Sequence, residues 1–146
     1  MADEVAVPVR GALRRAKLHR PATRTHGTIV FVHGSGEATV DDFAWYTGQF
    51  TDLGIACLVV DKVMDGYSQT RRHYDALADD AGDALRWACQ QPDLHDAPVG
   101  LLGSRFAQWY EVWLRGRASG AEHSATRSTR SGYRAAAVAA IQLPSL

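Results

Sequence analysis

Two almost purely apolar segments of strand length constrain the fold of this chain more than any other feature. They are residues 28–32 and residues 55–60, and both are rich in β-branched side chains. Strands of this composition are buried on both faces, as in parallel sheets covered by helices on each side. A third apolar segment, residues 98–102, ends at Gly103. The chain is therefore expected to contain at least three strands of one buried sheet.

Helical patterns separate these segments. Asp41 and Asp42 are predicted to cap a helix that runs to about Leu53, and Gly54 is the predicted terminator. Residues 70–89 are predicted to form a long helix, whose core stripe recurs at intervals of three and four residues: Leu77, Ala81, Ala84, Leu85 and Ala88. Strands that alternate with helices favour an α/β fold with right-handed crossovers.

The two ends of the chain differ from this pattern. Residues 5–9 and 12–18 are predicted to form two strands of an N-terminal β-hairpin around Arg10 and Gly11. Residues 1–103 are expected to form about half of an α/β domain. Residues 104–146 contain six arginines and two glutamates but no lysine or aspartate, and they are rich in alanine and serine. This composition predicts a poorly structured tail.

Composition excludes several classes of protein. The 146 residues suffice for one domain with a core, and the formal net charge of zero gives no attraction to nucleic acid or an anionic membrane. No apolar segment approaches the roughly 20 residues that span a bilayer. The acidic N-terminus lacks an apolar signal core, so a cytoplasmic location is expected. Cys57 and Cys89 have no metal-ligand spacing and are predicted to be buried thiols.

The first apolar strand ends in His33, Gly34, Ser35 and Gly36. Glycine allows the backbone to come close to a ligand. In serine hydrolases, a loop of this kind donates a backbone N–H to the oxyanion of a tetrahedral intermediate. Gly34, Ser35 and Gly36 are therefore the predicted oxyanion-hole residues, and His33 is predicted to be a structural hydrogen-bonding residue.

Four features together resemble the N-terminal half of an α/β hydrolase, near the dienelactone-hydrolase, acyl-thioesterase and prolyl-oligopeptidase-like branches. They are the strand with the 33–36 loop, the helix after it, the stretch from Val59 to Ser68 that contains Asp61 and Lys62, and Val99–Gly103. The resemblance implies a partial, mainly parallel sheet flanked by helices, and hydrolysis of an ester, thioester or amide without a cofactor or metal. It also implies that the stretch around Asp61 is structural and that Gly103 leads into the nucleophile elbow.

The elbow departs from the family pattern, which is a small residue, any residue, serine, any residue and a small residue. With Gly103 as the first small residue, Arg105 occupies the nucleophile position, and its guanidinium stays protonated. With Ser104 as the nucleophile, Leu102 and Phe106 occupy the two small positions. Ser104 is the candidate catalytic residue, but both of these neighbours are sterically unsuitable.

The other members of a catalytic triad are also missing. After Ser104 there is no aspartate, and the remaining candidates are Glu111, Glu122 and a single histidine, His123, which no strand pattern precedes. Two interpretations stay open. Either the reading frame shifts near Ser104 in GC-rich DNA, or the chain is a degenerate hydrolase-like domain that binds rather than catalyses.

The remaining charged clusters have simpler interpretations. The four helix aspartates, Asp75, Asp79, Asp80 and Asp83, are predicted to face solvent rather than to bind a cation. Arg127, Arg130 and Arg134 are predicted to be solvated, since no nucleic-acid-binding module accompanies them. The expected partners are a small acyl substrate, if the chain is active, and a second copy through an open sheet edge.

Overall fold

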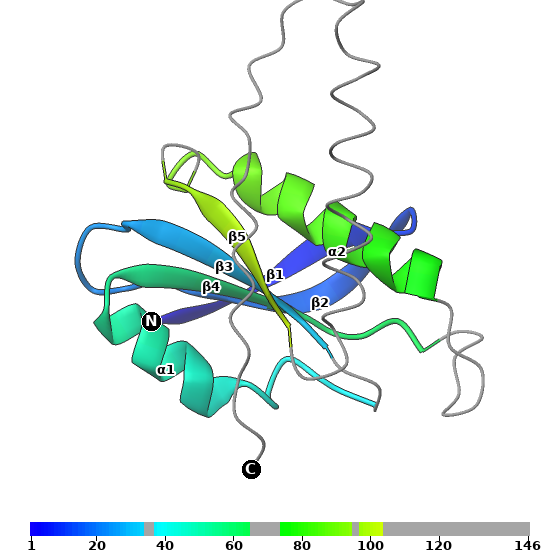
Figure 1. The fold of residues 1–146 in the computed structure, drawn as a ribbon, viewed down its shortest axis with the longest axis horizontal. Helices are drawn as coiled ribbons and strands as arrows, with labels where there is room; N and C mark the ends of the chain where they lie inside the picture. Colours follow the sequence, from blue (N-terminus) through cyan, green and yellow to red (C-terminus); the bar gives the residue numbers. More distant parts are fainter. Residues whose placement is uncertain (34–36, 65–73, 95–96, 104–146) are drawn as a thin grey trace, which may run out of the picture.

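A computed structural model describes residues 1–33, 37–64, 74–94 and 97–103 (Figure 1). In chain order, the elements in these ranges are β1 (Ala2–Val9), β2 (Ala12–His19), β3 (Gly27–Val32), α1 (Ala44–Asp52), β4 (Ile55–Val60), α2 (Tyr74–Cys89) and β5 (Val99–Gly103). The predicted strands and the hairpin are confirmed. The predicted tail, 104–146, and the predicted first turn of the long helix, 70–73, lie outside the described residues.

The strands form one mixed sheet in the order β1-β2-β4-β3-β5. β3 pairs in parallel with β4 on one side and with β5 on the other. β2 pairs antiparallel with β4, and β1 pairs antiparallel with β2 as a hairpin. The three apolar segments identified in the sequence are therefore β3, β4 and β5, which form the parallel part of the sheet.

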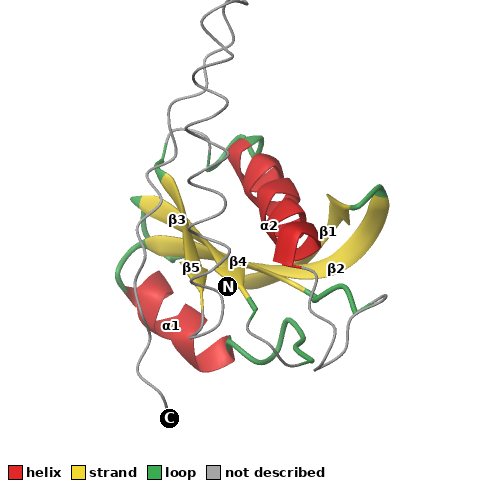
Figure 2. Cartoon of the chain, turned by 45° about the vertical axis from the view of Figure 1, so that its right-hand side comes forward, coloured by secondary structure: helices red, strands yellow, loops and turns green. Residues whose placement is uncertain are grey.

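α1 and α2 cover opposite faces of the sheet (Figure 2). Because side chains alternate between the faces of a strand, each of the parallel strands supplies both cores. The larger core faces α2 and contains Val7, Val9, Ala16, Leu18, Val30, Val32, Ala56, Leu58, Val60 and Leu101 together with Leu77, Ala78, Ala81, Ala84 and Ala88 of the helix. The core on the α1 side contains Phe31, Val40, Phe43, Cys57, Val59 and Leu102. Of the helices in the described part of the chain, neither is long and apolar enough to cross a bilayer.

The tip of the N-terminal hairpin is fastened to α2. Arg10 and Gly11 have φ values of 50° and 71°, as a two-residue type I′ turn requires. The Arg10 guanidinium donates to both carboxylate oxygens of Asp80, at 2.6 and 2.8 Å, and its backbone N–H donates to Asp83 at 3.0 Å. The prediction that these two aspartates face solvent is therefore wrong, because a distant turn supplies their partner.

The start of α1 also differs from the prediction. Its N-terminal residue is preceded by Phe43, and no side chain caps that position. Instead, Asp42 accepts a hydrogen bond from the backbone N–H of Thr39 at 2.5 Å, and the Thr39 hydroxyl accepts one from Asp41 N–H at 3.3 Å. This reciprocal pair resembles a capping box for the helical turn that precedes α1. Asp42 is therefore the residue of this box whose side chain binds the Thr39 N–H, and it does not cap α1.

Gly54 ends α1, as predicted. Its φ of +77° lies in the left-handed region, and a Cβ atom at this position would lie 2.6 Å from Cδ2 of His26. The Gly54 carbonyl also accepts a hydrogen bond from His26 N–H at 2.8 Å, which links the helix end to the start of β3. Glycine is therefore required here by conformation and by close approach.

We expect Gly54→Ala to lower the free energy of unfolding by about 1–2 kcal/mol, because an L-residue in this conformation is strained. The His26 ring must also move to make room. Gly48→Ala is the matched control, since Gly48 lies within α1 with open space around it. That change should stabilise the protein by up to about 1 kcal/mol through helix propensity. Urea unfolding of both variants measures the difference, and equal stability of the two would contradict the requirement for glycine at 54.

Candidate functional site

The carboxyl ends of β3, β4 and β5 lie at the same end of the sheet. In the parallel register, Val32 of β3 is opposite Gly103 of β5, and Phe31 is opposite Val59 of β4. Ligands of open α/β sheets bind beyond the carboxyl ends of the strands, so this end of the sheet is the candidate site. The predicted oxyanion residues, 34–36, and Ser104 lie outside the described residues. The structure nevertheless brings the strand ends from which both segments continue, Val32 and Gly103, side by side.

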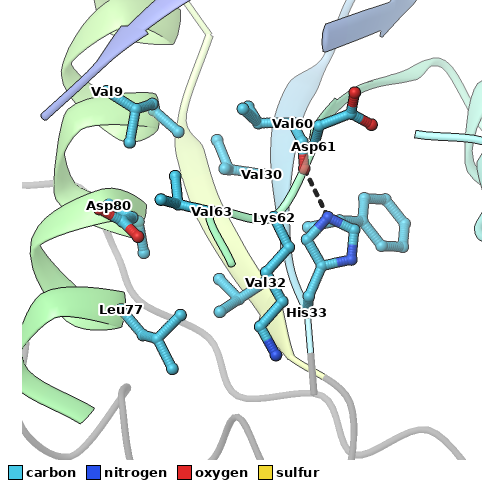
Figure 3. Close-up of a pocket in the computed structure, with 13 residues that line it drawn as sticks. Val9, Val30, Val32, His33, Val60, Asp61, Lys62, Val63, Leu77 and Asp80 are labelled. Atoms are coloured by element: carbon cyan, nitrogen blue, oxygen red, sulfur yellow. Dashed lines mark hydrogen bonds between the residues drawn. The ribbon is translucent and has the colours of Figure 1, made fainter. Parts of the chain in front are cut away.

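His33 is the first residue after β3, and it is only 7% exposed. Its Nε2 lies 2.5 Å from the carbonyl oxygen of Val60, at the end of β4 (Figure 3). Because a carbonyl only accepts, Nε2 holds the proton. Nδ1 is buried and has no hydrogen-bond partner within the described ranges, and the ring packs against Phe43 with centroids 5.2 Å apart. The prediction that His33 is a structural hydrogen-bonding residue is confirmed.

The environment of His33 favours the neutral ring. Burial lowers its pKa, and the hydrogen bond to Val60 opposes this only in part. The nearby charges are mixed, with Lys62 lowering the pKa and Asp42 and Asp61 raising it. A neutral ring whose Nε2–H is already bound to the backbone has no free proton-accepting nitrogen on that side for a substrate.

Asp61 follows β4 and connects three parts of the chain. Its Oδ1 accepts a hydrogen bond from Val40 N–H at 2.8 Å, and its own N–H donates to the Arg15 carbonyl at 2.9 Å. The next residue, Lys62, donates its N–H to the Ala38 carbonyl at 3.3 Å. These bonds agree with the structural role that the family resemblance implied for this stretch. Sequence patterns contain no signal for Val40 and Ala38 as the partners, because each lies more than 20 positions from the residue it contacts.

A pocket of about 50 Å³ opens beside these groups, between the sheet and α2 (Figure 3). Side chains from β1, β3, β4 and α2 line it, and most are apolar: Val9, Val30, Val32, Val60, Val63, Leu77, Ala81 and Ala84. Its polar lining consists of His33, Asp61, Lys62 and Asp80. This volume is well below the roughly 300–1,000 Å³ of pockets for drug-sized ligands. Sequence reasoning missed the pocket because its walls come from segments far apart in the chain.

Neither cysteine has the properties of a reactive thiol. Cys57 is fully buried in the core on the α1 side, and burial raises its pKa to about 12. Cys89 is half-buried, and burial raises its pKa as well. Both are free thiols. Among the residues that the structure describes, no group of three or more His, Cys, Asp or Glu side chains is arranged to hold a metal ion.

Sequence comparison finds no matching family model and no matching curated protein. Solved structures do match the fold. A dienelactone hydrolase from Anabaena variabilis is 23% identical with a TM-score of 0.66, over 82% of this chain and 59% of its own. An esterase from Pyrobaculum calidifontis is 21% identical with a TM-score of 0.63, over 81% and 41%. The α/β hydrolase GrgF from Penicillium is 17% identical with a TM-score of 0.65, over 78% and 41%.

These likenesses establish the fold. The chain has a partial α/β-hydrolase-type fold, as the resemblance in sequence implied. It spans between about two fifths and three fifths of the length of these three structures.

The buried neutral His33 makes stability depend on pH. Since its pKa in the folded state lies below the ordinary value of 6.5, the unfolded chain takes up the proton first as the pH falls. The stability that the neutral His33 ring contributes is fully present above about pH 6.5, and it is lost as the pH falls below that value. We expect His33→Gln, whose side-chain amide still donates a hydrogen bond, to remove part of this loss.

Urea unfolding between about pH 5 and pH 7.5 measures the effect, which for one proton is at most about 1.4 kcal/mol per pH unit. His26→Gln is the matched control, because the His26 side chain is less buried than that of His33. The partly buried His19, whose pKa burial also lowers, contributes equally to all three proteins. An identical pH slope in the wild type and in His33→Gln would contradict the assignment of a neutral, buried His33.

Proposed function

We propose that this chain is a hydrolase-type scaffold for acyl compounds, an ester, thioester or amide, whose nucleophile elbow lacks a working serine. The observation that supports it is the parallel register of β3 and β5, which pairs Val32 with Gly103. Acyl transfer requires a nucleophile and an oxyanion donor within reach of one carbonyl group. The segments that begin with Gly34 and with Ser104 follow the ends of the neighbouring strands β3 and β5, at the same end of the sheet.

The chemistry expected at this end of the sheet is acyl transfer through a serine. The hydroxyl oxygen attacks the carbonyl carbon, its proton passes to a base, and the carbonyl oxygen becomes an oxyanion that backbone N–H groups stabilise. In this proposal the donors come from the region of Gly34, Ser35 and Gly36. The nucleophile would come from the position directly after β5.

Two features argue against a working nucleophile and a working histidine base. If Ser104 were the nucleophile, the first small position of the elbow would be Leu102, and that side chain is 2% exposed and part of the core on the α1 side. A leucine whose removal would open the core cannot move aside for a sharp turn. In addition, the Nε2–H of His33 is bound to the Val60 carbonyl and its Nδ1 atom is buried, so we do not expect this ring to replace a missing catalytic histidine.

A non-catalytic binding protein on the same scaffold is the second candidate. The pocket beside β3 and β4 favours it, since about 50 Å³ with mostly apolar walls suits a short alkyl group better than a whole substrate. Methyl butyrate is a suitable probe. Perturbation of the amide signals of Val30, Val63 and Ala81 by this ester, without its hydrolysis, would support the second candidate.

The decisive experiment is covalent labelling of the full chain with a fluorophosphonate probe, combined with p-nitrophenyl acetate hydrolysis. We expect no labelling above that of the heat-denatured chain, and no difference in rate between the wild type and Ser104→Ala. Ser119→Ala is the matched control in the same region of the sequence. Labelling that is lost in Ser104→Ala but kept in Ser119→Ala, with a rate loss of about 10³-fold or more, would establish a working nucleophile and overturn the proposed inactivity.

The reading-frame hypothesis has its own test in the encoding DNA. Translation downstream of the Gly103 codon in the other two frames should produce a small-x-Ser-x-small elbow followed by further strand and helix patterns. If neither frame does so, the frameshift is excluded and the degenerate domain is the better explanation.

A further inference from the structure

Among the strands that the structure describes, β5 has a neighbour on one side only. It pairs in parallel with β3, and it is the last strand in the sheet order β1-β2-β4-β3-β5. An edge strand presents a row of backbone N–H and C=O groups to whatever lies beside it. Natural proteins guard such edges with charged side chains or proline. The two outer strands of this sheet, β1 and β5, differ in these devices.

β1 is guarded against further pairing, and β5 is not. β1 carries the carboxylates of Asp3 and Glu4, and it contains Pro8, which has no N–H to donate. β5 consists only of valine, leucine and glycine. A strand without charge or proline can accept another strand along its outer side. The composition of β5 therefore suits pairing with a further strand.

One hydrogen bond fixes the direction of the outer backbone groups of β5. The Pro98 carbonyl accepts the N–H of Thr28 at 2.8 Å, so it points toward β3. Successive residues of a strand direct their N–H and C=O groups to opposite sides, so Gly100 and Leu102 also bond toward β3. The residues whose backbone groups point away from β3 are Val99, Leu101 and Gly103.

The side chains of β5 make this strand complementary to itself in the antiparallel direction. In the register that pairs all five residues, Leu101 lies opposite Leu101 of a second copy, and Val99 lies opposite Gly103. These residues direct their backbone groups outward, so about six hydrogen bonds form between the copies. Gly100 then lies opposite Leu102 in a non-hydrogen-bonded pair, where the Cα atoms approach to about 4.5 Å. Away from the central leucine, each large side chain therefore lies opposite a glycine.

A hollow of about 160 Å³ beside Gly100 adds to this complementarity. Its walls are mostly apolar and include Ile29, Ile55, Pro98 and Leu102. Ile29 is opposite Gly100 in the register of β3 and β5, and Leu102 lies on the same face of the sheet, toward α1. In the antiparallel pair, Leu102 of the second copy stands beside this hollow at the distance of a directly opposed side chain. Two-fold symmetry gives both copies the same contact.

Charge does not oppose contact between two copies of this chain. The formal net charge is zero, and residues 97–103 contain no charged side chain. Identical proteins with a net charge near zero associate more readily, because they do not repel one another. A second copy is therefore compatible with this edge in charge as well as in side-chain size.

We propose that β5 pairs antiparallel with β5 of a second copy, about a two-fold axis at Leu101, and that the two copies form a dimer with one continuous sheet. Each copy contributes the same residues, so the contact is closed. β1 is then the outer strand at both sides of the sheet, and its carboxylates and proline stop further addition. This inference goes beyond the proposed function and does not depend on it, since it involves neither a nucleophile nor an oxyanion donor.

Amide hydrogen exchange of the full chain by NMR tests the pairing directly. In the dimer, the N–H groups of Val99 and Leu101 are bound to the second copy. We therefore expect their exchange to slow about tenfold or more when the protein concentration is raised about a hundredfold. Gly100 and Leu102 are the internal control, because their N–H groups are bound to β3 in the monomer and in the dimer.

The competing occupant of this edge is a strand from residues 104–146 of the same chain. Exchange at Leu101 that is equally slow at every protein concentration would assign the edge to that segment and overturn the proposal. Exchange at Leu101 that is fast at every concentration would overturn it as well.

Sedimentation velocity of the full chain measures the oligomeric state. We expect a dimer, and we expect Gly100→Lys to raise its dissociation constant about tenfold or more, because an ammonium group would lie against Leu102 of the second copy. Gly48→Lys is the matched control. It adds the same charge in α1, where nothing lies within 4 Å of a new Cβ atom, so it should leave the dissociation constant unchanged.

Three results of this experiment would overturn the proposal: a monomer at every concentration, open-ended larger species, or equal weakening by the two lysine substitutions. The exchange experiment uses the unmodified chain, so it decides the question if Gly100→Lys does not fold. Fluorophosphonate labelling tests the proposed function separately, so failure of one does not imply failure of the other.

Discussion

Hydrogen bonds from both edges of β3, to β4 on one side and to β5 on the other, are the interactions on which the rest of this structure depends. A strand in that position must bury both faces, and its alternating residues do so: Val30 and Val32 pack beneath α2, while Phe31 packs against Phe43 on the α1 side. Parallel neighbours also require crossover connections, which places a helix on each face. The same pairing brings the carboxyl ends of the three parallel strands to one end of the sheet, where the candidate site lies.

The N-terminal hairpin extends this sheet and is attached by charge as well as by backbone pairing. Arg10 at its tip holds Asp80 and Asp83 of α2, and Arg20 at its base holds Asp93 beyond the end of that helix. Partly exposed ion pairs contribute little each, roughly 0–1 kcal/mol. Their effect here is to orient the hairpin, since they fix its tip against α2 and its base against the turn after that helix. The Arg10 backbone, which lies in the left-handed region, is held there by the same contacts.

At the candidate site, His33 and Asp61 serve the scaffold. His33 is bound to the backbone of β4, and Asp61 is bound to the backbone before α1. Both side chains are thus bound to backbone groups of other segments of the chain. In the proposed function, the backbone donors follow the end of β3, whereas the nucleophile would follow the end of β5.

The sequence by itself determined the fold class, the strands, the hairpin turn and the core stripe of α2, because alternation, helical spacing and turn residues are local patterns. It also identified Gly34, Ser35, Gly36 and Ser104, which stay predictions, and it indicated a structural role for Asp61 and His33. The prediction of Asp42 as the cap of α1 was wrong, because its carboxylate binds the Thr39 N–H. The prediction that Asp80 and Asp83 face solvent was also wrong, because both bind Arg10. Only the tertiary structure decided the partners: Arg10 for Asp80, Val40 for Asp61, the Val60 carbonyl for His33, and the walls of the small apolar pocket. Such contacts join positions about 20 to 70 residues apart, and no local pattern specifies them, because they depend on strand order, register and the faces on which the helices lie.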